Sequence, residues 1–191
     1  TDKVLAAQPG GWEFDIPGIY RCNGFPVTAC DTSRSIHRGN IYVLWSDQRQ
    51  GLDDTDVFLI RSTDGGTTWG PQVRVNQDAG AAHQFFPWMT IDPLTGHLWV
   101  VFYDRRATAG DETEVWVAVS RDGGASFSDF RVSETSFTPV SAVFFGDYIG
   151  IAARGGHVHP IWMRMDGTAL SIWTAMIDES SAIADNPGGA A

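Results

Sequence analysis

The chain has 191 residues, a length that suits one domain with a substantial core, and its 43% hydrophobic content excludes an intrinsically disordered protein. The formal net charge is −10, from 23 acidic and 13 basic residues, so the chain lacks the basic surface that binds nucleic acids or anionic membranes. No apolar run approaches the roughly 18 to 20 residues that cross a bilayer, and no leader precedes Thr1, so we expect a mature or trimmed chain without membrane insertion.

The first expected element is a short strand at residues 2–7, a candidate to complete a sheet formed elsewhere in the chain. Cys22 and Cys30 follow, on either side of the short loop NGFPVTA. An even pair this close indicates a disulfide made in an oxidising compartment, with two buried thiols as the alternative. Two cysteines without nearby histidines match no usual zinc pattern, so we expect neither a metal nor a cofactor.

The middle of the chain repeats itself. The segment IYVLWSDQR at 41–49 is matched by LWVVFYDRR at 98–106, and FPVTACD at 25–31 by PWMTID at 87–92. A third, looser copy starts at FFGDYIGIA (144–152) and continues through GGHVHPIWMR and LSIWTAMI. This copy has neither the turn motif of the other two nor an outer strand after it. Repeats of this density indicate stacked or radial structural units.

Each copy consists of short apolar or alternating runs bounded by Gly, Asp, Asn and Pro, which is typical of strands and tight turns. Four short antiparallel strands recurring every 40 to 60 residues or so predict an all-β protein made of β-propeller blades. A β-sandwich is the competing architecture, but it gives no reason for the same motif at the same place twice. We expect three blades within residues 1–184, at about 25–77, 85–134 and 143–178, followed by a flexible tail at 185–191.

Two turn motifs share the pattern Ser-x-Asp-x-Gly-x-x-aromatic, at 62–69 and 120–127. The Asp can accept hydrogen bonds from N–H groups of its own turn, and the glycines supply the positive φ that a tight hairpin needs. The pattern resembles the Asp-box, or BNR repeat, of sialidases and their relatives, in which it pins the hairpin between the third and fourth strands of a blade. The residues concerned are Ser62, Asp64, Gly66 and Trp69 in the first motif and Ser120, Asp122, Gly124 and Phe127 in the second.

The resemblance implies a six-bladed propeller with a sialidase site, in which three arginines hold the sugar carboxylate, an Asp is the acid/base and a Tyr–Glu pair supplies the nucleophile. In that family an Arg-Ile-Pro motif begins the arginine clamp. This chain has PheAspIlePro at 14–17, with Asp15 where the arginine would stand, and Arg21 lies outside the register of the motif. An acid there would repel the carboxylate of a sialic acid.

A second family landmark is an Asp-x-Arg pattern followed by an acid before the first turn motif, and AspGlnArgGlnGlyLeuAspAsp at 47–54 matches it. The match makes Arg49 a pocket arginine and Asp54 or Asp53 the catalytic acid/base. The alternative is structural, because the second copy repeats Asp104, Arg105 and Arg106 at the equivalent place, as an ion pair between neighbouring strands would require.

For the nucleophile the sequence offers Tyr148, expected on an innermost strand with its phenol facing the channel or, alternatively, packed in the core. Glu114 begins a third strand and has no evident route to Tyr148. His157 and His159 share one face of a strand, without a third ligand beside them. The tryptophans on expected strands fill the space between blades or remain exposed for sugar rings to stack on.

These features predict an exported sialidase-like domain, secreted, extracellular or periplasmic and of bacterial origin, that acts on sialic acid or a related terminal sugar. The alternative is a non-catalytic glycan-binding or structural module of a larger extracellular protein. Three blades cannot close a six-bladed ring, so we also expect a homodimer or further blades on another piece of chain.

Overall fold

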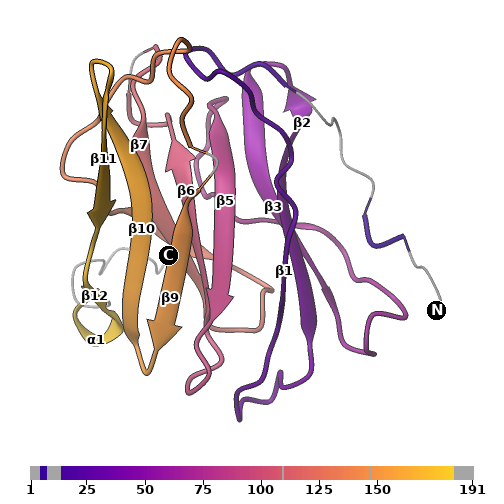
Figure 1. The fold of residues 1–191 in the computed structure, drawn as a ribbon. Helices are drawn as coiled ribbons and strands as arrows, with labels where there is room; N and C mark the ends of the chain where they lie inside the picture. Colours follow the sequence, from indigo (N-terminus) through magenta and orange to yellow (C-terminus); the bar gives the residue numbers. More distant parts are fainter. Residues whose placement is uncertain (1–4, 8–13, 109, 147, 183–191) are drawn as a thin grey trace.

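The computed structural model describes residues 5–7, 14–108, 110–146 and 148–182. Three antiparallel sheets follow one another around a common axis, so the fold is all-β and forms part of a β-propeller, as the repeats predicted. Figure 1 shows the strands running up and down the molecule. The innermost strands of the three sheets lie side by side, because the first strand of the middle sheet contacts the first strand of each neighbour.

Two of the sheets, blades A and B, have four strands in sequential order. Blade A consists of β1 (Val27–Cys30), β2 (Ile41–Gly51), β3 (Asp54–Ser62) and β4 (Val73–Arg74). Blade B consists of β5 (Gln84–Ile91), β6 (Leu98–Asp104), β7 (Glu114–Ser120) and β8 (Ser128–Arg131).

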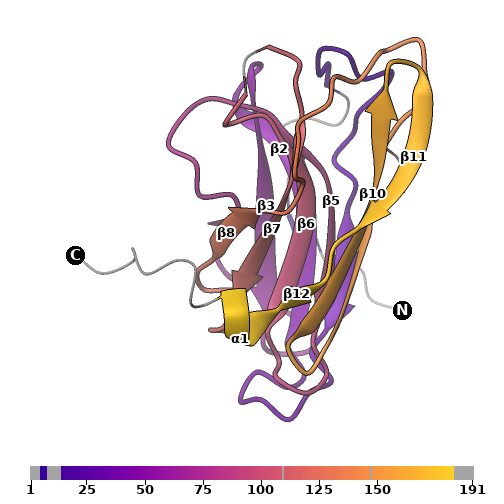
Figure 2. The same ribbon diagram turned by 90° about the vertical axis from the view of Figure 1, so that its left-hand side faces the viewer.

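Blade C is shorter by one strand position. It contains β9 (Gly150–Arg154), β10 (His157–Asp166), β11 (Ala169–Thr174) and β12 (Ile177–Asp178), followed by the one-turn helix α1 (Glu179–Ala182). Figure 2 shows β12 continuing the line of β11 down the blade towards α1.

β11 and β12 are one strand interrupted in the middle. Ile161 of β10 pairs with Thr174, and Val158 pairs with Ile177. Three residues separate the two pairs on each strand, so the register is the same on both sides of the break. The break falls beside Pro160, which has no N–H to donate to the ladder. The hydroxyl of Thr174 donates instead to the Pro160 carbonyl at 2.7 Å. Blade C therefore has three strand positions, and the missing outer strand agrees with the sequence.

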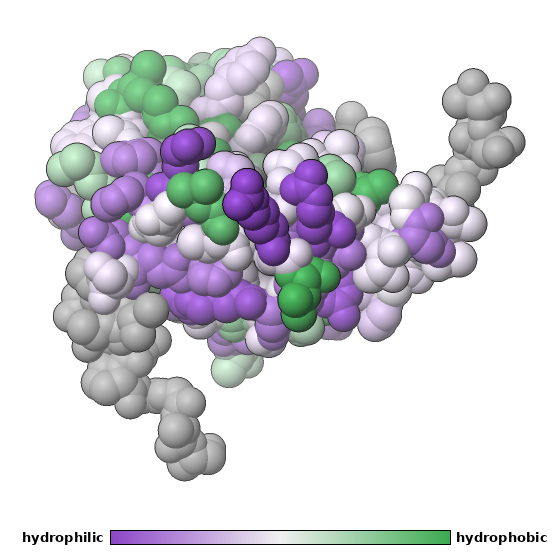
Figure 3. Space-filling view, turned by 90° about the horizontal axis from the view of Figure 1, so that it is seen from below, coloured by the Kyte–Doolittle hydropathy of each residue, from purple (hydrophilic) through white to green (hydrophobic). Residues whose placement is uncertain are grey.

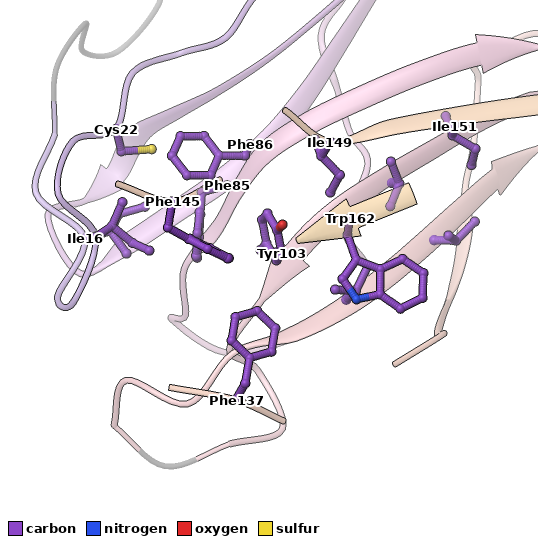
Figure 4. Packing of buried hydrophobic residues seen from close by; sticks show 14 of the residues in the cluster. Ile16, Cys22, Phe85, Phe86, Tyr103, Phe137, Phe145, Ile149, Ile151 and Trp162 are labelled. Carbon is purple, nitrogen blue, oxygen red and sulfur yellow. The ribbon is translucent and has the colours of Figure 1, made fainter. Parts of the chain in front are cut away.

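Two apolar cores fill the spaces between the blades. Alternate residues of β6 enter them: Leu98, Val100 and Phe102 enter the core between blades A and B, whereas Trp99, Val101 and Tyr103 enter the core between blades B and C. Because both faces of the blade are buried, nearly every β6 side chain is apolar. Figure 4 shows the B–C core, where Tyr103 stacks on Phe85 with ring centroids 5.6 Å apart.

The segment before β1 does not stay with blade A. Residues 14–24 cross the upper end of the molecule, at the top of Figure 1, and Ile16, Ile19 and Cys22 are buried in the B–C core. Arg105 fixes this segment by donating from Nη2 to the Pro17 carbonyl at 2.7 Å. The upper end thus joins residues from both halves of the chain.

The structure differs from two expectations for the N-terminal region: the disulfide is absent, and the described part of the expected strand at 2–7 is not a strand. Residues 5–7 form no strand, and Ala6 and Ala7 pack against Trp45 and its neighbours on the outer face of blade A. Cys22 and Cys30 form no disulfide: both are thiols, Cys22 in the apolar core and Cys30 exposed at the end of β1. Their side chains lie in different environments, which closeness in sequence does not reveal. Residues 2–4 and the expected tail at 185–191 lie outside the described residues.

The two Ser-x-Asp turns lie at the lower end, each between the third and fourth strands of its blade. In blade A, Asp64 accepts from the Thr68 N–H at 2.9 Å and from the Ser62 hydroxyl at 2.8 Å. Hydrogen bonds led by those from Thr68 lower the pKa of Asp64 to about 2. Asp122 makes the equivalent contacts in blade B. The hydrogen bonds predicted for the two turns are therefore present. Figure 3 shows that the surface at this end is largely hydrophilic.

Candidate active site at the upper end

Charged side chains gather at the upper end, where connections from blades A and B meet residues 14–24. We call this group, made of Asp53, Asp54, His83, Arg105 and Asp111, the upper cluster. Asp53 and Asp54 come from the β2–β3 hairpin, His83 immediately precedes β5, and Arg105 and Asp111 lie in the β6–β7 connection. The two aspartates, Arg105 and Asp111 all act electrostatically on His83.

His83 is buried, and its Nδ1 lies 2.9 Å from the Thr55 hydroxyl. Burial lowers the pKa of His83, and the Arg105 charge lowers it further, while Asp53, Asp54 and Asp111 oppose the shift. The imidazole is therefore neutral at pH 7 and can donate from one nitrogen and accept at the other.

Arg105 is the buried cation of the cluster. Besides the Pro17 carbonyl, its Nε donates to Thr113 at 3.1 Å, and its Nη1 lies 3.6 Å from Asp111. Its guanidinium lies 5.4 Å from the centre of the Phe85 ring. Burial lowers the pKa of Arg105, but a guanidinium remains charged at any physiological pH.

The β2–β3 hairpin fixes the positions of the two neighbouring aspartates, Asp53 and Asp54. Gln48 Nε2 donates to the Leu52 carbonyl at 2.8 Å and to the Thr55 hydroxyl at 3.1 Å, which ties the hairpin together. Asp53 is exposed, whereas Asp54 is half-buried and its Oδ1 is buried without a hydrogen-bond partner among the described residues. An acceptor in that state is a place for a proton or a substrate hydroxyl.

A hollow of about 470 Å³ adjoins the cluster on the crossing segment. Asp15, Tyr20, Arg21 and Asn23 supply its polar groups. The Arg21 guanidinium lies 5.1 Å from the centre of the Phe144 ring. The hollow is linked to the hairpin because Gln48 also reaches the Asp15 carbonyl at 3.5 Å.

Arg49 lies in a different setting. Its Nε donates to Asp47 at 2.8 Å, its Nη1 contacts Gln72, and its guanidinium lies 4.4 Å from the centre of the Phe58 ring. Arg106 repeats the arrangement with Asp104 at 2.7 Å. The two ion pairs occupy equivalent places in successive blades, as the structural alternative for Arg49 required, but each joins residues two apart in one segment of chain and not residues of neighbouring strands.

The structure does not bring the other sequence candidates together. Tyr148 lies two residues before β9 and is 81% exposed, so it is neither on an innermost strand nor packed in the core. Glu114 pairs with Arg131 at 2.7 Å. His157 and His159 lie on the exposed face of β10. In the described part of the chain, no three His, Cys, Asp or Glu side chains are placed to hold a metal ion.

Sequence reasoning overlooked His83 and Asp111, and it named Arg105 only as part of a structural repeat with Asp104 and Arg106. The available signal was a difference between repeats rather than a similarity. Arg49 and Arg106 stand at the same place in their copies, but Arg105 stands where the first copy has Gln48. A buried charge at a position that the fold itself does not require points to a local role.

Solved structures share this fold at low sequence identity. An α-L-arabinanase from Penicillium chrysogenum, complexed with arabinobiose, gives a TM-score of 0.60 at 13% identity, over 82% of this chain and 46% of that one. The GH93 α-L-arabinofuranosidase of Fusarium graminearum, also with arabinobiose, gives 0.52 at 14% identity, over 83% and 47%. A protein of unknown function from Dyadobacter fermentans gives 0.52 at 18% identity, over 74% and 35%.

This chain thus spans less than half the length of these three proteins. The likeness shows the fold of propeller glycoside hydrolases. No protein-family model matches the sequence, and no curated protein matches it. Nothing in the described residues forms a helix able to span a membrane.

Proposed function

We propose that the chain forms part of a propeller glycoside hydrolase and that the upper cluster contributes the reacting groups. The observation that carries the proposal is the gathering of three carboxyl groups, Asp53, Asp54 and Asp111, around a buried arginine and a neutral histidine. Two of the similar proteins, an α-L-arabinanase and an α-L-arabinofuranosidase, hold arabinobiose in their structures, which supports a glycan substrate.

Glycoside hydrolysis needs one carboxyl group to protonate the leaving oxygen and a second to act on the opposite face of the sugar. Asp54 suits the first role, because its Oδ1 is buried beside His83 and accepts no hydrogen bond from a described residue. Asp53 and Asp111 are the candidates for the second role, and Nη1 of Arg105 lies 3.6 Å from the Asp111 carboxylate. The hollow beside Asp15 and Arg21 would receive the sugar.

Sialic acid is the finer proposal, and the resemblance of the turn motifs to sialidases supports it. Two cations at the upper end, Arg21 and Arg105, are of the kind that binds a sugar carboxylate. Arabinosides are the competing substrates, and the exposed Asp15 in the hollow favours an uncharged sugar.

The decisive experiment compares a chromogenic substrate, 4-nitrophenyl α-L-arabinofuranoside, with a fluorogenic one, 4-methylumbelliferyl α-N-acetylneuraminide. We expect Asp54→Asn to lower kcat for the better substrate by roughly 100-fold or more, the usual contribution of a general acid, with an unchanged circular dichroism spectrum. Asp166→Asn, on the exposed β10–β11 hairpin, is the control. Unchanged activity in Asp54→Asn would show that this residue is not the general acid. If neither substrate is turned over, the proposed enzymatic function is wrong.

A glycan-binding module is the second candidate function. Trp88 on the inner strand β5 favours it, because this indole is 39% exposed beside the axis, where a sugar could stack on it. A glycan array that retains the chain while both synthetic substrates stay intact would select this function.

The same proposal includes export from the cell and completion of the ring by a second copy or by further blades. Apolar side chains on blade C support completion, since Ile161, Ile172 and Met176 are exposed while the outer face of blade A is covered by Ala6 and Ala7. Light scattering that finds a compact, stable monomer at micromolar concentration would exclude the dimer.

A further inference from the structure

A second cavity, which shares no lining residue with the upper cluster, lies in the wedge between blades B and C. It has a volume of about 270 Å³ and is bounded on one side by the chain that follows β8 and on the other by β10 and β11. We call it the wedge cavity. Its lining includes Ser133, Glu134 and Phe137 from blade B and Trp162, Arg164 and Trp173 from blade C.

The wedge is open because blade C has no fourth strand. In blade B the fourth strand, β8, contributes Phe130 to the apolar contacts of the B–C core. Blade C offers no counterpart outside β11. The side chains of β10 and β11 that point towards blade B therefore border empty space near the outer rim.

Two tryptophans form one wall. Trp162 and Trp173 stand directly opposite each other on neighbouring strands, so their side chains project from the same face of the sheet. Trp162 is buried, and Trp173 is 41% exposed. The CH face of a sugar ring packs on indole surfaces of this kind while its hydroxyl groups stay available to polar partners.

Arg164 supplies a donor without an acceptor. Its guanidinium lies 5.1 Å from the centre of the Trp173 ring, and its Nη2 donates to Asp166 at 3.1 Å. Its Nε is buried and has no hydrogen-bond partner among the described residues. A buried donor without a hydrogen-bond partner destabilises the fold, and a ligand oxygen that accepts its hydrogen bond would remove that cost.

We propose that the wedge cavity is a second saccharide site that takes one uncharged aldose ring of an oligosaccharide. The volume lies at the small end of ligand pockets, which suits a single ring. The charge of Arg164 is balanced by Asp166, and the exposed Glu134 adds a carboxylate at the rim, so an acidic sugar is repelled. The inference does not depend on catalysis at the upper cluster.

The test is a titration of the uniformly ¹⁵N-labelled full chain with arabinobiose, followed by NMR. We expect the Trp162 and Trp173 indole N–H signals and the Arg164 Nε–H signal to shift with one common saturation curve, while the indole signal of Trp116, which lies outside the cavity lining, gives no such curve. Trp173→Ala should weaken this binding roughly tenfold, the upper range for an aromatic contact. Leu170→Ala, which removes an apolar side chain of nearly equal exposure (40%) from the same strand but outside the cavity lining, should leave it unchanged.

Three results would overturn the proposal: no saturable shift at Trp162, Trp173 or Arg164, unchanged affinity in Trp173→Ala, or tighter binding of N-acetylneuraminic acid than of arabinobiose at these signals. A peptide of the β8 sequence FSDFRV serves as the competing ligand. If the peptide moves these signals and the sugar does not, the wedge accepts a polypeptide strand instead. Asp54→Asn should not alter the wedge titration, so failure at the upper cluster stays distinguishable.

Discussion

The hydroxyl of Thr55 lies 2.9 Å from Nδ1 of His83 and joins the third strand of blade A to the entry of blade B. Because burial and then Arg105 lower the pKa of this histidine, the folded state holds it neutral below pH 6.5, where the unfolded chain binds a proton. Stability is therefore lost as pH falls from about 6.5 towards the lowered pKa, with a slope of at most about 1.4 kcal/mol per pH unit for one proton.

We expect urea unfolding of the wild type to show this loss and His83→Gln, which can keep a hydrogen bond to Thr55, to lack it. The difference between the two proteins isolates His83 from the other titrating groups. Parallel pH curves for the two would show that His83 carries no such penalty.

Arg106 is predicted to matter more for stability than Arg49. Asp104 is fully buried, and Arg106 pairs with it and with Asp129 at 2.7 Å each. Arg106→Met leaves Asp104 without its cation and should cost about 3 kcal/mol of unfolding free energy at pH 7. Burial already raises the pKa of Asp104. Without the arginine the carboxyl will bind a proton more readily when folded, so the penalty should shrink as pH falls.

Arg49→Met is the matched control, because Asp47 keeps a 2.7 Å hydrogen bond from the Trp45 indole and the Arg49 side chain is 23% exposed against 12% for Arg106. Chemical denaturation of both variants measures the difference. Because Asp47 and Asp104 are both fully buried, equal costs would show that the Trp45 hydrogen bond and the greater exposure of Arg49 do not lessen the effect.

Gly146 is predicted to tolerate no side chain. Its φ is +91°, and a Cβ there would lie 2.4 Å from Cε2 of Phe86. Gly146→Ala should therefore cost about 3 kcal/mol, from backbone strain together with overpacking. Gly167→Ala has a similar φ of +60° but open space around it, and should cost only about 1 kcal/mol. Thermal unfolding compares the two, and a smaller loss for Gly146→Ala than for Gly167→Ala would contradict the packing.

The thiols of Cys22 and Cys30 should react at very different rates. Cys30 is exposed, whereas Cys22 lies in the B–C core. We expect Ellman's reagent to label one thiol in the native protein and two in denaturant, without any reductant. A protein that yields no thiol until it is reduced would restore the disulfide interpretation.

Much of the fold could be read from the sequence because its repeats are local patterns. The alternation of apolar residues in β6 and the Ser-x-Asp turns after Ser62 and Ser120 determine strands and hairpins within a few residues of themselves. The site could not be read in the same way. His83, Asp54 and Asp111 meet only because three connections converge at one end, and Ile16 packs in a core far along the sequence. The tertiary contacts that determine these positions produce no periodic pattern in the sequence.

The crossing of residues 14–24 has a consequence for synthesis on the ribosome. These residues are synthesised well before much of the core that their apolar side chains enter, which includes Phe137 and Phe145. Blade A can assemble its own sheet early, but residues 14–24 reach their full packing only after the chain has been synthesised past Phe145. A nascent chain arrested after blade B should accordingly leave Ile16 and Ile19 open to chaperones, and release of blade C should close them.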